Sequence, residues 1–183
     1  SPTALVTFHP VTLDFSSAEE QFDEVLAALA ERPEMKIIFT MPNSDTDGRV
    51  IIKLINDFVS KNPKQYKAFV SLGQLRYLSA LKHVDLVIGN SSSGLIEAPS
   101  FKIPTINIGD RQKGRIKAAS VINCEPTRSS LGQALNLAFD PDFKASLHNL
   151  KNPYGEAGAS KKIKDILCEF DLENIIKKNF YDL

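Results

Sequence analysis

The chain has 183 residues, of which 43% are hydrophobic and 24% charged, a composition typical of one ordinary soluble globular domain. Its 22 lysines and arginines balance 22 aspartates and glutamates, so neither a nucleic acid nor an anionic membrane surface is expected as a partner. No apolar run approaches the roughly 18 residues of a membrane span, and the first residues lack the pattern of a signal peptide. We therefore expect a cytoplasmic protein.

Strand and helix patterns alternate along the chain at nearly constant spacing, which indicates βαβ units and a parallel sheet. Strands are expected over 4–8, 35–40, 66–71, 85–89, 104–109 and 120–124. Helices are expected over 17–31, 47–61, 75–83, 129–139 and 158 to about 178. The predicted fold class is α/β: a single Rossmann-like domain over 1–183 with a parallel sheet flanked by helices, in which 158–183 form a C-terminal helical segment.

Three shorter features refine this expectation. Ser17 and Glu20 form a capping-box pattern at the start of the first helix. The turn-rich stretch 152–160 is either a hinge or an ordered loop. The chain enters a strand pattern after two residues and without Met, which indicates a piece of a longer polypeptide.

The two cysteines, Cys124 and Cys168, lie far apart, without CxxC spacing or neighbouring histidines. This favours two free thiols in a reducing cytosol over a disulfide framework or a zinc site. We expect no metal and no other cofactor.

The stretch "VIGNSSSGLIEAPS" (87–100) reads as a strand, a turn and the start of a helix. Ligands of open parallel sheets bind at the carboxyl ends of the strands, where the following helices begin. Free backbone N–H groups over 92–95 and the serine hydroxyls favour a phosphate there. Alternatively, Ser93 or Gly94 only caps the helix, with Glu97 in its first turn. Capping explains one serine more easily than three.

Two common phosphate motifs are absent, because the chain has neither GxxxxGK[ST] nor GxGxxG. Polar residues follow other strands. His9 follows the first strand, where a neutral imidazole can act as acid, base or phosphate donor, or can only stabilise its loop. Asn43 offers an amide edge but is also an ordinary turn residue. The backbone around Leu72 can meet a flat base, and Arg111 and Arg115 either neutralise a phosphate or lie in a solvated loop.

Four segments, "TFHPVT", "MPNSDTDGR", "GNSSSGLIEA" and "GDRQKGR", occur in an order and spacing that resemble the C-terminal half of hydrolysing UDP-N-acetylglucosamine 2-epimerases of the sialic-acid-pathway branch. The resemblance spans roughly residues 3–165. The serine motif is shared with many glycosyltransferase-like proteins, but the four segments together are specific. The resemblance implies a GT-B architecture, in which two Rossmann-like halves bind a nucleotide sugar between them. This chain would be one half, and its partner would be the N-terminal half of the same enzyme.

The resemblance implies that seven residues contact UDP: His9, Asn43, Leu72, Ser91, Ser92, Glu97 and Arg111. Ser91 and Ser92 would hold the diphosphate, and Glu97 would accept hydrogen bonds from both ribose hydroxyls. The side chain of Asn43 and the backbone at Leu72 would line the uridine side, while Arg111 reaches the nucleotide. His9 would face the substrate and is the catalytic candidate. Pro99 is expected to shorten or kink the helix after Glu97.

The implied reaction is loss of UDP from C1 of UDP-GlcNAc with removal of the proton at C2, followed by addition of water to the opposite face, which yields ManNAc and UDP. The carboxylates that serve as bases in the family lie largely in the N-terminal half. We therefore expect the isolated chain to bind UDP weakly and to turn over nothing. The donor-binding half of a GT-B glycosyltransferase and a non-catalytic nucleotide-sensing module stay open as alternatives, and so does a homo-oligomer.

Overall fold

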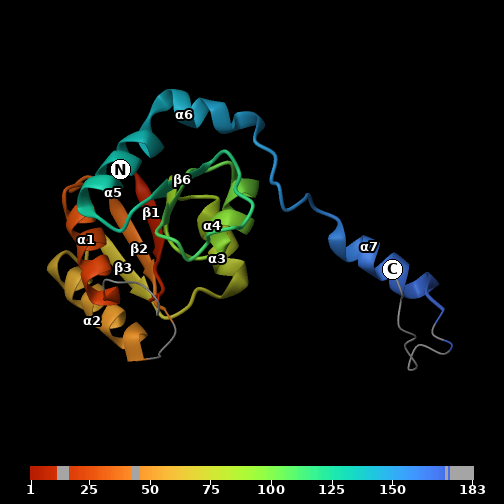
Figure 1. The fold of residues 1–183 in the computed structure, drawn as a ribbon, viewed down its shortest axis with the longest axis horizontal. Helices are drawn as coiled ribbons and strands as arrows, with labels where there is room; N and C mark the ends of the chain where they lie inside the picture. The colour runs from red at the N-terminus through yellow and green to blue at the C-terminus, as the bar shows by residue number, and fades with distance from the viewer. Residues whose placement is uncertain (12–16, 43–45, 172, 174–183) are drawn as a thin grey trace.

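The computed structural model of the chain describes residues 1–11, 17–42, 46–171 and 173 (Figure 1). Its centre is a six-stranded sheet with the strand order β3-β2-β1-β4-β5-β6. Every neighbouring pair is parallel. This confirms the predicted α/β class. The order reverses between β1 and β4, which is the switch point where ligands of such sheets bind.

All six predicted strands are present, and their ends differ from the expected ones by at most two residues. The strands are β1 (Thr3–Thr7), β2 (Lys36–Thr40), β3 (Tyr66–Phe69), β4 (Leu86–Gly89), β5 (Thr105–Ile108) and β6 (Val121–Cys124). All four residues of β4 and of β5 are buried, because these strands lie inside the sheet with helices on both faces.

The helices are α1 (Ala18–Ala30), α2 (Thr46–Lys61), α3 (Gly73–Leu81), α4 (Ser93–Ile96), α5 (Arg128–Phe139), α6 (Pro141–Ser146) and α7 (Ala159–Glu169), with 3-10 helices η1 (Ala98–Phe101) and η2 (Leu147–Asn149). The helices α1 to α4 and the 3-10 helix η1 connect the first five strands, and the other helices follow β6. The capping box at α1 is confirmed, because the Glu20 N–H donates to Ser17 Oγ at 3.2 Å and the Ser17 N–H donates to Glu20 Oε2 at 3.0 Å.

The sequence pattern differs from the structure at two places. It predicts no element over 141–149, where the structure has α6 and η2. Asp140 caps α6 by accepting from the Phe143 N–H at 2.8 Å, and Pro141 occupies the first turn, so the pair starts a helix. The last helix is predicted to about residue 178 but ends at Glu169. The remainder of the predicted C-terminal segment, from residue 174, lies outside the described residues.

Helices cover both faces of the sheet (Figure 1). One face packs against α1, α2 and α5, where the rings of Phe8 and Phe22 lie in a tilted contact with centroids 5.2 Å apart inside the larger core cluster. The other face packs against α3 and η1 through a smaller cluster that includes Leu5, Leu81 and Val87. The sheet therefore lies between two layers of helices, and this packing fixes the position of its carboxyl edge.

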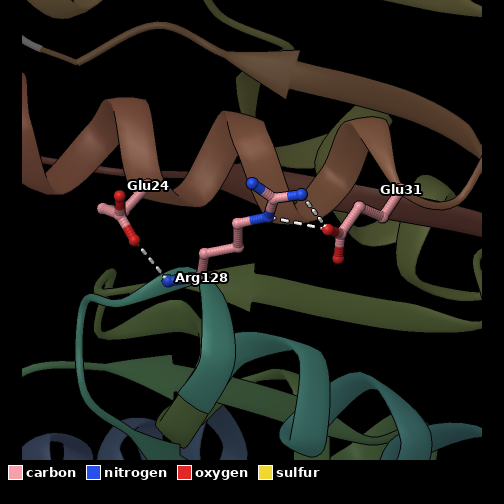
Figure 2. A network of polar contacts seen from close by, with 3 residues as sticks. All are labelled: Glu24, Glu31 and Arg128. Atoms are coloured by element: carbon pink, nitrogen blue, oxygen red, sulfur yellow. Dashed lines mark hydrogen bonds and ion pairs between the residues drawn. The ribbon is translucent and has the colours of Figure 1, made fainter.

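A polar network joins α1 to α5 (Figure 2). The Arg128 N–H, at the first turn of α5, donates to Glu24 Oε2 at 2.7 Å. The Arg128 Nε donates to Glu31 Oε1 at 2.7 Å, and Nη2 contacts the same oxygen. The pair is half-exposed, so it orients α5 on α1 more than it stabilises the fold.

The segment that leads to α7 is tied to the domain at two points. Asn152 Nδ2 donates to the carbonyl of Ile96 at 2.7 Å and to Ser100 Oγ at 2.7 Å. Tyr154 Oη donates to the carbonyl of Ile116 at 3.0 Å. Of the two readings of 152–160, the structure favours the ordered loop. Beyond it, α7 stands away from the sheet in Figure 1, and none of its residues is buried.

No helix in the described part of the chain has the length and apolar character needed to cross a membrane.

Candidate functional site

A cleft of about 370 Å³ opens at the carboxyl edge of the sheet. Its floor is formed by Thr7 and Thr40 at the ends of β1 and β2, whose hydroxyl oxygens lie 2.5 Å apart. One wall is the β3–α3 connection with α3, over residues 70–78, and the other is the turn after β4, over residues 91–97. The cleft therefore lies beside the switch point between β1 and β4.

The close approach of β4 to β1 requires glycine at position 89. Gly89 has φ +137°, and a Cβ there would lie 1.9 Å from the backbone oxygen of Thr7. The next residue continues the contact, because the Asn90 N–H donates to the same oxygen at 3.2 Å. Gly89 thus allows the turn that contains the three serines to begin in direct contact with β1.

In the turn after β4 over residues 91–97, called the serine turn below, most backbone N–H groups donate hydrogen bonds to acceptors within the turn. The N–H of Ser93 donates to Ser91 Oγ at 3.4 Å, that of Gly94 to the Ser91 carbonyl at 3.3 Å, and that of Leu95 to the Ser92 carbonyl at 3.0 Å. The expectation of free donors over 92–95 is therefore wrong for these three. Because α4 has only four residues, its dipole is also small. The donors that this turn still offers to an anion are therefore its hydroxyl groups.

The capping alternative is also wrong in its detail. The N-cap of α4 is Ser92, whose side chain makes no capping hydrogen bond, and not Ser93 or Gly94. Glu97 is the C-cap of α4 and lies outside its first turn. The reason is Pro99, which occupies the first turn of η1 and limits the preceding α-helix to a single turn, as predicted.

Glu97 is half-buried at the wall of the cleft. Burial raises the pKa of its carboxyl above the usual value. No donor among the residues the structure describes forms a hydrogen bond or ion pair with its side-chain oxygens. A carboxylate is acceptor-only, so these oxygens suit a ligand that offers hydroxyl donors.

Three hydroxyl groups, one from α3 and two from the turn after β4, form a chain between the two walls. Tyr77 Oη lies 2.5 Å from Ser93 Oγ, which lies 3.3 Å from Ser91 Oγ. Burial raises the pKa of Tyr77; the hydrogen bond with Ser93 lowers it, and the negative charge of Glu97 raises it further. Tyr77 is therefore a neutral phenol at physiological pH and can donate a proton to a hydrogen bond.

Asn90 joins three loops at the edge of the cleft and is 1% exposed. Its Oδ1 accepts from the His9 N–H and its Nδ2 donates to the His9 carbonyl, both at 2.7 Å. Its own carbonyl accepts from Arg111 Nη1 at 3.0 Å and from Gln112 Nε2 at 2.8 Å. The loops after β1, β4 and β5 are thereby held together.

These contacts show where the residues expected at the site lie. Leu72, Ser91 and Glu97 line the cleft. His9 and Arg111 lie at the ends of β1 and β5 and are connected to Ser91 through the neighbouring Asn90. Ser92 follows in the same turn but is not part of the lining.

Asn43 lies outside the described residues. Arg115 is exposed in the loop after β5.

Sequence reasoning missed Tyr77 and Asn90. For Asn90, its place directly after a buried strand was an available signal, whereas nothing in its helical pattern distinguishes Tyr77 from a core residue.

The cysteines contribute no reactive group to the cleft. Cys124 is buried at the end of β6, and burial raises the pKa of its thiol to about 12. Cys168 is exposed on α7, and neither forms a disulfide. Within the described ranges, no cluster of three or more histidine, cysteine or acidic residues is arranged to hold a metal ion.

The chain is similar in sequence and in fold to proteins of one family. The family model described as UDP-N-acetylglucosamine 2-epimerase matches residues 1–168. A GDP/UDP-N,N'-diacetylbacillosamine 2-epimerase (hydrolyzing) of Campylobacter jejuni is 39% identical over 98% of this chain and 46% of its own length. A polysialic acid biosynthesis protein of Escherichia coli is 36% identical with the same coverage. The structure of a Methanocaldococcus jannaschii UDP-GlcNAc 2-epimerase in complex with UDP-GlcNAc and UDP superimposes with a TM-score of 0.68, at 20% identity over 91% of this chain and 45% of that one. The chain thus spans slightly less than half the length of these relatives.

Proposed function

The chain belongs to the UDP-N-acetylglucosamine 2-epimerase family, and from this premise we propose that it is the UDP-binding, C-terminal half of a hydrolysing UDP-GlcNAc 2-epimerase. Residues 1–183 form one nucleotide-sugar-binding domain, whose C-terminal segment 158–183 includes α7. The observation that carries the proposal is the cleft at the switch point. There Glu97, whose carboxylate has no partner among the described residues, lies on the same wall as the hydroxyl of Ser91.

The proposed binding mode assigns each part of UDP to a part of the cleft. Glu97 accepts hydrogen bonds from both ribose hydroxyls, which supply the donors its carboxylate lacks. The diphosphate lies at the hydroxyls of Ser91 and Ser92, with Arg111 as the nearby cation. The uracil lies toward the backbone at Leu72, and Asn43 completes that side.

The proposed reaction makes use of this arrangement at the leaving group. A base supplied by the N-terminal half removes the proton from C2, the bond between C1 and the diphosphate oxygen breaks, and UDP leaves with the electron pair. Water then adds to the resulting glycal from the opposite face, which gives ManNAc. Because negative charge accumulates on the departing diphosphate, hydroxyl donors and Arg111 held in place before the reaction stabilise that transition state. His9 faces the sugar.

The isolated chain lacks the other half, so we expect it to bind UDP weakly without turning over UDP-GlcNAc. Titration of the isotopically labelled chain with UDP, followed by NMR chemical shifts, tests the site. Glu97→Gln should weaken UDP binding about 10- to 150-fold, which corresponds to about 1.5–3 kcal/mol for hydrogen bonds to a charged group. Unchanged UDP affinity in Glu97→Gln would favour a nucleotide-sensing module in which the serine turn has only a structural role.

The full-length polypeptide tests the reaction. Incubation with UDP-GlcNAc in deuterated water should release UDP and ManNAc deuterated at C2, as followed by proton NMR. A parallel incubation with UDP-N,N'-diacetylbacillosamine asks whether the sugar of the Campylobacter jejuni relative's name is preferred. Absence of any reaction until a sugar acceptor is added would instead identify a GT-B glycosyltransferase.

A further inference from the structure

We propose that Tyr77 is a positioning residue for the diphosphate: its hydroxyl, acting through Ser93, turns the hydroxyl proton of Ser91 toward the ligand. This inference rests on the proposed function and assigns a role to a residue of α3 that does not itself hold the phosphates. It predicts that the Tyr77 hydroxyl, on the wall opposite Ser91, increases the affinity for UDP but not for uridine.

The direction of the hydroxyl chain follows from counting protons. Each hydroxyl group has one proton to donate. Ser91 Oγ accepts from two groups of Ser93, its N–H at 3.4 Å and its Oγ at 3.3 Å. Because the proton of Ser93 Oγ is used in this bond, the bond of 2.5 Å between Tyr77 and Ser93 must be donated by Tyr77. The proton of Ser91 is the one left over, and Ser91 lines the cleft.

Tyr77 is well placed to be the first donor in this series of hydroxyl hydrogen bonds. Its ring packs with Leu78 and Leu81 in the smaller hydrophobic cluster beneath α3, so the phenol oxygen has a fixed place. Its burial keeps the phenol protonated, and therefore a donor. Hydrogen bonds in a chain polarise one another, which strengthens the last donor, here Ser91, toward an anion.

Without the Tyr77 hydroxyl, the Ser93 hydroxyl is free to turn away from Ser91. The Ser91 hydroxyl can then rotate to donate to its neighbours, and the ligand loses a prepared donor. The uracil and ribose do not meet Ser91 in the proposed mode, so only phosphate-bearing ligands are affected. A packing role for the Tyr77 ring would instead change the affinity for uridine and UDP alike.

The test is a double-mutant cycle on the 183-residue chain, with Tyr77→Phe, Ser93→Ala and the combination. Dissociation constants for UDP and for uridine are measured by NMR titration, and thermal unfolding is recorded for each variant. Tyr154→Phe is the matched control, because it removes a hydroxyl that donates to the Ile116 carbonyl away from the cleft.

We expect Tyr77→Phe and Ser93→Ala each to weaken UDP binding about three- to tenfold, the usual range for one hydrogen bond. Uridine affinity should change by less than about twofold, and the double variant should bind UDP as Ser93→Ala does. An unchanged UDP affinity in Tyr77→Phe, an equal loss for uridine, or effects that multiply in the double variant would each overturn the role of Tyr77. These outcomes leave the proposed function intact, whereas absence of UDP binding by the unaltered chain overturns both.

Discussion

Gly94 offers a sharp test of how the serine turn packs on the sheet. A Cβ at this position would lie 2.8 Å from the Cγ2 methyl of Thr105, while its next neighbour, Val87 Cγ1, is 3.8 Å away. Thr105 is 2% exposed, and its hydroxyl donates to the Gly94 carbonyl at 3.1 Å. The obstacle to a side chain at position 94 is therefore one methyl group.

The magnitudes follow from this geometry. Overpacking a buried site costs about 1–3 kcal/mol, and replacing glycine by alanine within a helix returns up to about 1 kcal/mol, so Gly94→Ala should lower the free energy of unfolding by about 1–2 kcal/mol. Thr105→Ser removes the methyl and keeps the hydroxyl, at a cost of about 0.5–1.5 kcal/mol. In the double variant, the methyl group added at position 94 occupies the space of the methyl group removed at position 105. The double variant should therefore be at least as stable as Thr105→Ser.

The assay is urea unfolding followed by circular dichroism, because the chain has no tryptophan for fluorescence. Gly132→Ala on α5 is the control: a Cβ there meets nothing within 4 Å, so it should stabilise the protein by up to about 1 kcal/mol. If the losses of Gly94→Ala and Thr105→Ser simply add in the double variant, the argument that the two groups compete for one space is refuted.

Three further predictions concern the same edge of the sheet. Gly89→Ala should cost more than about 4 kcal/mol and leave little folded protein by circular dichroism, since its Cβ would meet the Thr7 backbone at 1.9 Å and its φ is +137°. Asn90→Ala should lower the free energy of unfolding in urea by about 2–3 kcal/mol, because the His9 N–H and carbonyl lose their side-chain partners; a loss below about 0.5 kcal/mol would contradict this. The raised pKa of Glu97 predicts opposite pH trends: as pH rises from the ordinary carboxyl pKa through the folded one, the unfolded chain ionises first and stability falls, while UDP affinity increases as the carboxylate forms. Glu97→Gln should remove the contribution of Glu97 to both pH profiles, as measured by parallel urea and NMR titrations of the variant and the unaltered chain.

The order of elements was readable from the sequence because apolar periodicity reports directly on local structure. The six strands and the capping box at Ser17 follow from patterns within a few residues of one another. The parallel sheet then brings the loops after successive strands to one edge, which is why the sequence predicts that His9, Ser91 and Arg111 gather there. The start of α6 at Pro141 was less readable, because a proline can start a helix as well as end one.

The pairing of particular side chains across the site could not be read in the same way. Asn90 contacts His9, which is 81 residues away, and Tyr77 contacts Ser93 from another helix. A helical position such as that of Tyr77 is compatible with core packing and with a role at the cleft. Which of these holds depends on how α3 crosses the sheet and how far β4 extends beside β1. The positions of α3 and β4 depend on packing between segments far apart in the chain. Local periodicity carries no information on that packing.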